Sequence, residues 1–277
     1  MKSMKITALI ENTGKDENYC TEHGLSLYTE TSDEIILFDT GSSGNFALNA
    51  KILGKDLSAV DFAVISHGHY DHGDGLSAFF EQNAEALVYI QESAFEKHYS
   101  AKPNGTLKYN GLREDYASNC RFVKLNGNHS VNERSDIFSS VTGNRLMPIS
   151  NKNLFVLKNE EYLQDDFCHE QNLVLRENDK LVLITGCAHK GIVNILESFK
   201  EKYKVYPTHV VGGFHLFTDN ICDNNYIDIV HKTGLALKGM KTTFYTCHCT
   251  GKEAFESLKD LMGSSLHYLC TGEEITI

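Results

Sequence analysis

The stretch Asp61-Phe-Ala-Val-Ile-Ser-His-Gly-His-Tyr-Asp-His-Gly-Asp-Gly-Leu76 decides the fold, because an apolar run ends in it abruptly at three histidines and a carboxylate. Residues 62–65 are four apolar residues bounded by an aspartate and a glycine-rich turn, and this length predicts a short buried strand. The glycines that follow allow the chain to curl tightly. The segment therefore predicts a strand that opens into a ligand-bearing loop.

The loop carries the pattern His-x-His-x-Asp-His, made by His67, His69, Asp71 and His72. His67 and His69 are two residues apart, so in extended backbone both rings point to one side and can hold one metal ion. Asp71 and His72 lie beyond the bend and can face a second ion. The alternative is a polar surface loop with incidental histidines, but ligand types at this density are typical of a metal site.

The chain length and the net charge restrict the class of protein. A chain of 277 residues is long enough for one α/β domain with a large core and loop insertions. The 26 basic and 37 acidic residues give a net charge of −11, which disfavours non-specific nucleic-acid binding but allows a local basic pocket for one phosphorylated substrate. No apolar run approaches about 20 residues, and residues 1–6 lack a signal-peptide core, so we expect no membrane span and a cytoplasmic protein.

The eight cysteines are scattered along the chain, with no Cys-x-x-Cys pair. A chain of this size folds without disulfide bonds, so we expect most cysteines to be reduced thiols. Four disulfide bonds in an exported protein are the alternative.

The first hundred residues predict strands and helices in alternation, which is typical of the α/β class. We expect strands over residues 6–10, 23–30, 34–41, 62–65 and 86–90, and helices over residues 45–57, 75–83 and 93–99. Asp39 stands at the end of the third strand. There it can orient a ligand histidine, or it can form an Asx turn with Thr40 or Gly41.

Residues 100–165 have no steady period apart from a predicted strand over residues 121–125, and we expect them to form an irregular insertion or cap over the active site. His129 in this insertion is predicted to be an exposed turn residue. Beyond it, residues 172–176 and 180–185 predict two short strands joined by a turn.

Three further strand ends combine histidine with glycine. They are Gly186-Cys-Ala-His-Lys-Gly191, Thr208-His-Val-Val-Gly-Gly-Phe-His215 and Thr242-Thr-Phe-Tyr-Thr-Cys-His-Cys-Thr-Gly251. The carboxyl ends of strands are where α/β folds build their sites. Three such endings, after the earlier His-x-His-x-Asp-His, favour a shared site over coincidence.

These motifs resemble those of the metallo-β-lactamase superfamily. His67-Gly-His-Tyr-Asp-His72 resembles its signature, and Leu37-Phe-Asp-Thr-Gly41 is similar to its usual strand in the first half. Five stretches together resemble the subfamily of dihydropterin ribofuranosylaminobenzene phosphate synthase-like hydrolases: residues 22–26, 66–72, 185–195, 212–216 and 247–251. The resemblance covers most of residues 5–277 and is weakest between about 100 and 160.

The resemblance implies a single domain, 1–277, folded as a four-layer αββα sandwich with its site at the shared edge of two sheets. Carried over to this chain, it implies that His67 and His69 bind the first metal ion. His169, which precedes the strand predicted at 172–176, is the expected third ligand of that ion.

For the second metal ion, the resemblance implies Asp71, His72 and His248 as ligands. Cys187 stands where many relatives carry a metal-bridging aspartate, and His189 is the alternative ligand beside it. A thiolate at this position favours zinc, whereas a protonated thiol would leave only one ion tightly bound. We therefore expect two divalent ions, with zinc favoured and manganese or iron as alternatives.

The expected activity is metal-dependent hydrolysis of a small substrate, which can be a phosphorylated one. A metal-bound hydroxide would attack a carbonyl or phosphoryl centre, with Asp71 orienting the nucleophile or taking its proton. His215 or His189 would contact the substrate.

Other functions stay open. A transferase would condense a dihydropterin with ribofuranosylaminobenzene phosphate, as the named subfamily does. A di-iron redox protein or a non-catalytic metal binder would use the same loop differently, and metal analysis separates them from a zinc or manganese hydrolase. A nuclease is disfavoured by the net charge and by the absence of an aromatic and basic stripe.

Overall fold

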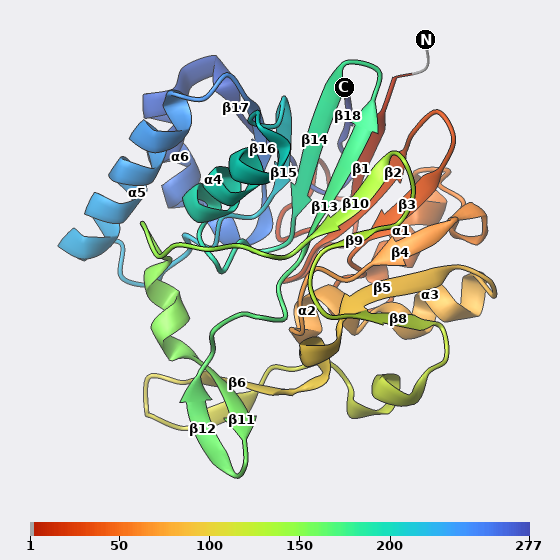
Figure 1. Ribbon diagram of the computed structural model, residues 1–277, viewed down its shortest axis with the longest axis horizontal. Helices are drawn as coiled ribbons and strands as arrows, with labels where there is room; N and C mark the ends of the chain where they lie inside the picture. The colour runs from red at the N-terminus through yellow and green to blue at the C-terminus, as the bar shows by residue number, and fades with distance from the viewer. Residues whose placement is uncertain (1–2) are drawn as a thin grey trace. The chain divides into compact units, whose positions relative to one another are not determined.

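The computed structural model describes residues 3–277, in which the chain forms two compact units (Figure 1). The proximal unit comprises the residues up to Gly127, together with Asn153–Gln171 and Leu269–Ile277, and the distal unit comprises Asn128–Lys152 and Asn172–Tyr268. Met1 and Lys2, part of the segment expected to lack a signal-peptide core, lie outside the described residues. Within residues 3–277, no helix combines the length and apolar character needed to cross a membrane.

The proximal unit is built on a seven-stranded sheet in the order β18-β1-β2-β3-β4-β5-β8. Its strands are β1 Lys5–Ile10, β2 Ser26–Glu30, β3 Ile35–Phe38, β4 Phe62–Val64, β5 Leu87–Gln91, β8 Phe122–Leu125 and β18 Glu274–Thr276. β3, β4, β5 and β8 run parallel to one another. The carboxyl ends of β3 and β4 therefore lie at one edge of the sheet, where Asp39 and the loop of residues 66–72 follow them.

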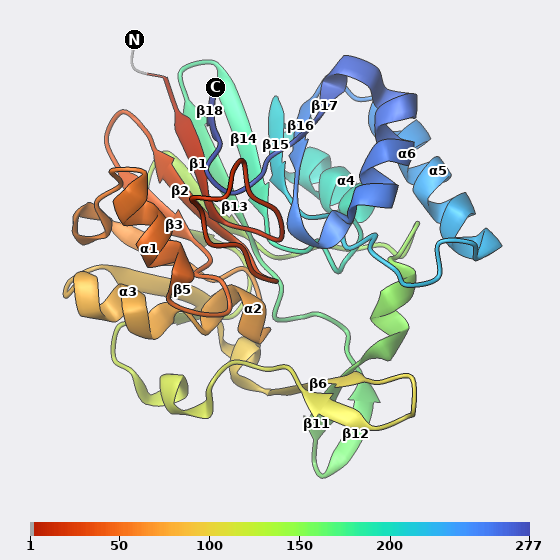
Figure 2. The same ribbon diagram turned by 180° about the vertical axis from the view of Figure 1, so that it is seen from behind.

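Helices α1 Asn45–Ile52 and α3 Leu76–Gln82 lie side by side on one face of this sheet (Figure 2). Phe46 of α1 and Phe79 of α3 are fully buried in a core that includes Ala63 of β4 and Val88 of β5. The short helix α2 Tyr70–Gly73 forms part of the ligand-bearing loop. The strands and helices predicted for residues 6–90 are confirmed; most are shorter than predicted, while β1 begins one residue earlier and β5 is shifted by one residue.

The prediction of a helix over residues 93–99 is wrong. The chain makes a short 3-10 turn, η2 Glu92–Phe95, and then strand β6 Lys97–Ala101. β6 joins a four-stranded sheet with β7 Leu107–Tyr109, β11 Leu154–Lys158 and β12 Glu161–Gln164. Its residues pair with β11 more than fifty positions away, and such tertiary pairing overrides local helix preference. The insertion of residues 100–165 thus contains regular strands.

The distal unit is built on a second seven-stranded sheet in the order β17-β16-β15-β14-β13-β10-β9. Its strands are β9 His129–Ser130, β10 Ser135–Phe138, β13 Asn172–Glu177, β14 Lys180–Thr185, β15 His209–Gly212, β16 Thr243–Thr246 and β17 Leu266–Tyr268. The predicted pair of strands at 172–185 is confirmed, and His129 is exposed as predicted, although it lies in a short strand. β14, β15 and β16 run parallel, with Thr185, Gly212 and Thr246 in register.

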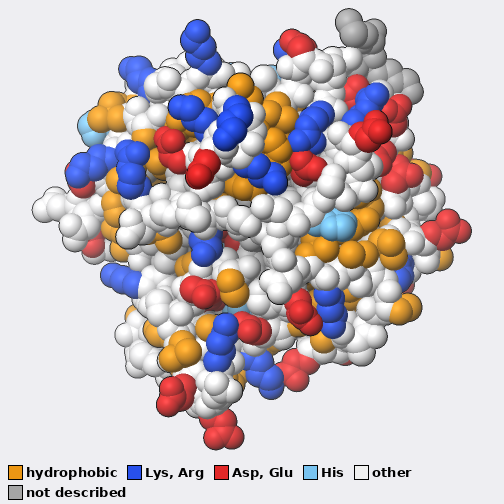
Figure 3. Space-filling view, in the orientation of Figure 1, with side chains coloured by type: hydrophobic (Ala, Val, Ile, Leu, Met, Phe, Trp, Pro, Cys, Tyr) orange, Lys and Arg blue, Asp and Glu red, His pale blue; other side chains and the backbone are white. Residues whose placement is uncertain are grey.

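Three helices complete the distal unit: α4 Ile192–Tyr203, α5 Asn224–Lys238 and α6 Lys252–Met262. Phe199 of α4 and Leu258 of α6 are fully buried in one core with Val210 and Phe244 of the sheet. On the exposed side of these helices, Lys and Arg side chains lie next to Asp and Glu (Figure 3). The helices therefore bury one face and leave a mixed-charge face in solvent.

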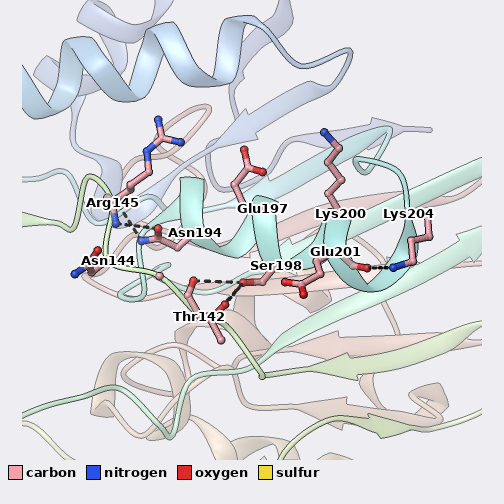
Figure 4. A pocket seen from close by; sticks show the side chains of 10 residues that line it. Thr142, Asn144, Arg145, Asn194, Glu197, Ser198, Lys200, Glu201 and Lys204 are labelled. Carbon is pink, nitrogen blue, oxygen red and sulfur yellow. Dashed lines mark hydrogen bonds between the residues drawn. The ribbon is translucent and has the colours of Figure 1, made fainter.

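Asn194 on α4 fixes the segment that crosses the start of this helix (Figure 4). Its Nδ2 donates to the carbonyl oxygens of Arg145, at 2.9 Å, and Lys190, at 2.8 Å, and its Oδ1 accepts from the Arg145 N–H at 3.0 Å. One helical turn later, Ser198 Oγ accepts from the Thr142 N–H at 3.0 Å. These side chains line a cavity of about 610 Å³.

We expect Asn194→Ala to lower the free energy of unfolding by about 2–4 kcal/mol, because one N–H and two carbonyl groups lose a buried partner. Urea denaturation measures the change. Glu201→Ala, on the exposed side of the same helix, serves as the control and should stay within about 0.5 kcal/mol of the parent protein. Equal stability of both variants would contradict the clamping role of Asn194.

Glu274 of β18 is the centre of a charged group on the proximal sheet. Its carboxylate lies 3.1 Å from Lys5 Nζ and 2.7 Å from Lys55 Nζ, and Lys55 also contacts Glu30. The hydrogen bond from Lys55 is the main cause that lowers the pKa of Glu274 to about 2. The ionised form of Glu274 therefore stabilises the folded chain.

A carboxylate with a lowered pKa contributes stability above its unfolded pKa, here near 4.5, and loses the contribution as the pH falls through its folded pKa near 2. We expect the thermal unfolding temperature to fall between pH 5 and pH 2, and Glu274→Gln to make that fall shallower. Glu256→Gln, an exposed change on α6, should leave the slope as it is. Superimposable pH profiles for the parent and Glu274→Gln would refute the assignment.

Candidate functional site

The loop after β4 buries all four members of its His-x-His-x-Asp-His pattern. His67 and His72 are fully buried, and His69 and Asp71 are 4% and 6% exposed. The ring centroids of His67 and His72 are 4.2 Å apart, and those of His67 and His69 are 4.6 Å apart. Buried polar side chains need partners, and clustered imidazoles with a carboxylate suit a divalent cation.

Asp39, at the end of β3, orients this loop. Its Oδ2 lies 2.6 Å from His72 Nδ1 and accepts from Ser66 Oγ, while its Oδ1 accepts from the Ser66 N–H at 2.7 Å. With Nδ1–H bound to a carboxylate, the Nε2 lone pair of His72 is directed away from Asp39. The alternative of an Asx turn is wrong, because the N–H groups of Thr40 and Gly41 donate to backbone carbonyls elsewhere.

The Asp71 carboxylate lies between two imidazoles. Its Oδ2 is 3.3 Å from Nε2 of His23 and 3.5 Å from Nε2 of His72. Gly24, next to His23, approaches the loop so closely that a Cβ there would lie 2.6 Å from the Asp71 carbonyl oxygen. His23 was not among the predicted site residues, although the stretch that contains it contributed to the resemblance.

His169 lies beside His69, one of its two expected co-ligands, with their ring centroids 5.4 Å apart. Its Nδ1 accepts from the Gly68 N–H at 2.9 Å, and its Nε2 faces Asp165 Oδ2 at 3.2 Å. The same Asp165 oxygen is 2.9 Å from Nδ1 of His98. One donor atom each from His69, His98, Asp165 and His169 falls within 4.8 Å of all the others, so this set could also hold a cation.

Burial sets the ionisation of this second group. Burial, reinforced by neighbouring imidazoles, lowers the pKa of His69 and of His169, so both rings are neutral. Burial alone would raise the pKa of Asp165, but the contacts from His169 and His98 outweigh it and lower that pKa. A carboxylate surrounded by imidazoles has the composition of a metal-ligand set.

Sequence reasoning missed His98 and Asp165. His98 was placed in the helix that the structure replaces with β6, where it is buried, and Asp165 falls in the insertion without a steady period.

In the distal unit, the turn after β14 carries Cys187 and His189, both almost fully buried. Asn151 Nδ2 donates to the His189 carbonyl oxygen at 2.7 Å, and Asn151 Oδ1 lies 3.2 Å from His189 Nδ1. This contact places the ring proton on Nδ1 and leaves the Nε2 lone pair for a ligand. The turn after β15 brings the ring of His215 to 4.1 Å from that of His189, centroid to centroid.

The turn after β16 adds His248 and Cys249. One donor atom each from Cys187, His248 and Cys249 lies within 4.8 Å of the others, and the same holds for Cys187, His189 and His215. Burial would raise the pKa of the Cys249 thiol, but the hydrogen bond with Cys187 and the electrostatic contacts with His248 and His215 lower that pKa well below its usual value.

Three residues of these turns have left-handed backbone conformations. Ala188, His215 and His248 have φ values of 57°, 50° and 51°. Such conformations cost about 1–3 kcal/mol for residues other than glycine and cluster at functional sites. The distal unit therefore holds its donor side chains in strained turns.

Comparison with known proteins agrees with the resemblance that the sequence motifs indicated. The sequence model of the metallo-beta-lactamase superfamily matches residues 23–148. The solved structure of Tm1679, described as a metal-dependent hydrolase of the beta-lactamase superfamily, is 28% identical, with a TM-score of 0.82 over 99% of both chains. The fold is therefore the mixed α/β metallo-β-lactamase fold.

Two curated relatives come from Methanocaldococcus jannaschii. One, the uncharacterized protein MJ0448, is 27% identical over 92% of this chain and 94% of its own length. The other, 7,8-dihydropterin-6-methyl-4-(beta-D-ribofuranosyl)-aminobenzene-5'-phosphate synthase, is 29% identical over 91% of this chain and 89% of its own length. With its signature loop, its fold and these similarities, the chain is similar to members of the metallo-β-lactamase superfamily.

Proposed function

We propose that this protein is a metal-dependent hydrolase that acts on a small substrate. The observation that supports the proposal most is the loop after β4, which buries three imidazoles and a carboxylate next to one another. A protein interior accepts such a cluster when a cation or a catalytic role compensates for its desolvation.

The donor sets fit divalent metal ions. On the proximal unit, the proposed ligands are His67, His69, Asp71, His72 and His169. On the distal unit, they are Cys187 and His248, with His189 as the alternative. A divalent ion bound by such ligands lowers the pKa of water toward about 7 and stabilises negative charge that develops on the substrate.

The side chains of the chain supply positioning and proton transfer. Asp71 is the proposed general base, since its Oδ2 lies 3.3 Å from His23 Nε2 and can pass a proton toward that imidazole. Asp39 holds His72 in one orientation. His189 and His215, whose rings lie in contact, are proposed to bind the substrate.

A cavity of about 290 Å³ beside the loop supports a small substrate. Tyr70 of the loop lines it, together with Lys108 and Arg113. Lys108 is exposed, so it can meet an anionic group of the substrate such as a phosphate, whereas Arg113 already pairs with the Asp115 carboxylate.

A synthase reaction is the second candidate, because the relative that is 29% identical carries the name of a dihydropterin-linked synthase. Incubation of the purified protein with ester, lactone and phosphoester substrates, and separately with a dihydropterin and a ribofuranosylaminobenzene phosphate, separates the two reactions. Elemental analysis of the same sample addresses the third alternative, since iron with a visible absorption band would favour redox chemistry over zinc or manganese hydrolysis.

Asp71→Ala should reduce kcat by about 10²–10⁴ on whichever substrate is turned over, because general-base catalysis contributes that much. Circular dichroism should show an intact fold, since Asp71 lies at the site rather than in the apolar core. Asp228→Ala, on exposed helix α5, is the control and should keep the parent rate. Undiminished kcat in Asp71→Ala would remove this residue from the mechanism.

Asp39→Asn should weaken metal binding about 10–100-fold, because loss of the carboxylate leaves the His72 imidazole less basic and less well oriented. Competition with a chromogenic chelator measures the affinity. Asp33→Asn, on the exposed turn between β2 and β3, is the matched control. If both variants bind metal as the parent does, Asp39 plays no part in the metal centre.

A further inference from the structure

We propose that Cys249 is a metal ligand, and that Cys187, His248 and Cys249 together form a thiolate-rich metal site within the distal unit. The inference rests on the proposed function in one respect, namely that His248 and Cys187 bind metal. It adds Cys249 as a second sulfur ligand of the same ion. Neither Cys249 nor a second thiolate was expected from the sequence.

The topology brings the three residues together. β14, β15 and β16 are adjacent parallel strands whose last residues, Thr185, Gly212 and Thr246, are in register. Cys187 follows β14 by two residues, and His248 follows β16 by two residues. The turns that carry the donors therefore start side by side at one sheet edge, which is the usual place for sites in parallel sheets.

The donor atoms are close enough for one ion. All three lie within 4.8 Å of one another, and the residues Cys187, His248 and Cys249 are 3%, 2% and 5% exposed. In a tetrahedral zinc site, bond lengths of about 2.3 Å to sulfur and about 2.0 Å to nitrogen place ligand atoms about 3.5–3.8 Å apart.

The surroundings of Cys249 are shaped for a sulfur that carries negative charge. The backbone N–H of His215 donates to Cys249 Sγ at 3.3 Å, and hydrogen bonds of this kind support thiolate ligands. Gly213 makes room for the sulfur, since a Cβ there would lie 2.4 Å from Cys249 Sγ. His215 reaches this position through its left-handed backbone.

Cys249 Sγ lies 3.6 Å from the Cys187 carbonyl oxygen, to which the protonated thiol donates. Metal binding forms a metal–sulfur bond and releases that proton to solvent. Two thiolates and one imidazole select a borderline-soft ion, so the site is assigned to Zn²⁺ rather than to Mn²⁺ or Mg²⁺. Co²⁺ and Cd²⁺ are its spectroscopic substitutes.

Titration of the metal-free full-length protein with Co²⁺ tests the proposal. Near-ultraviolet absorption from thiolate-to-cobalt charge transfer, per bound ion at the thiolate site, should fall by about half in Cys249→Ser and also in Cys187→Ser. Cys222→Ser, which removes an exposed thiol of the same unit, is the control and should leave the band unchanged.

An unchanged band in Cys249→Ser, with a halved band in Cys187→Ser, would overturn the inference and leave the proposed metal function standing. Bound metal without any charge-transfer band would overturn the thiolate site, and absence of bound metal would overturn the proposed function with it. Cadmium-113 NMR of the parent protein keeps the test valid if Cys249→Ser misfolds. A resonance shifted to the range of two sulfur ligands supports the proposal, and one in the range of a single sulfur refutes it.

Discussion

The buried carboxylate of Asp39 is the constraint on which the proximal unit depends. It accepts hydrogen bonds from the backbone and side chain of Ser66 and holds His72 through Nδ1, so one side chain at the end of β3 fixes both ends of the loop after β4. The backbone strengthens this link, because the Thr40 N–H donates to the His72 carbonyl oxygen at 2.8 Å. A buried carboxylate is costly unless it is fully hydrogen-bonded, and here those bonds shape the ligand loop.

In the distal unit, the backbone topology positions the donor side chains, a role that the Asp39 carboxylate has in the proximal unit. Three parallel strands end in register, and each following turn contributes donors that are distant in sequence. Left-handed conformations at Ala188, His215 and His248 set the direction of the backbone in these turns. Backbone strain of this kind persists only where the surrounding structure determines it. Asn151 then sets the tautomer of His189 from another segment.

The two donor groups differ in chemical hardness. The proximal group combines imidazoles with the carboxylates of Asp71 and Asp165, whereas the distal group combines imidazoles with the thiols of Cys187 and Cys249. Oxygen ligands tolerate many divalent ions, but sulfur ligands favour zinc over manganese and magnesium. Metal choice in this protein is therefore expected to depend on the cysteines more than on the signature loop.

The sequence by itself determined the strand at 62–65, the ligand pattern that follows it, and the strand endings that carry Cys187, His189, His215 and His248. Those features are local, since they depend on apolar runs, two-residue spacing and glycine turns that a short window of sequence contains. The orienting role of Asp39 was also visible from its place at the end of a strand.

Only the tertiary structure decided which residues lie next to the predicted site residues. His98 and Asp165 meet His169 because β6 pairs with β11 across more than fifty residues, and this pairing also turned a predicted helix into a strand. Cys249 gained its role from the adjacent turn that carries Gly213 and His215. Contacts of this kind depend on which distant segments pack together, and the local pattern of residue types does not determine that packing.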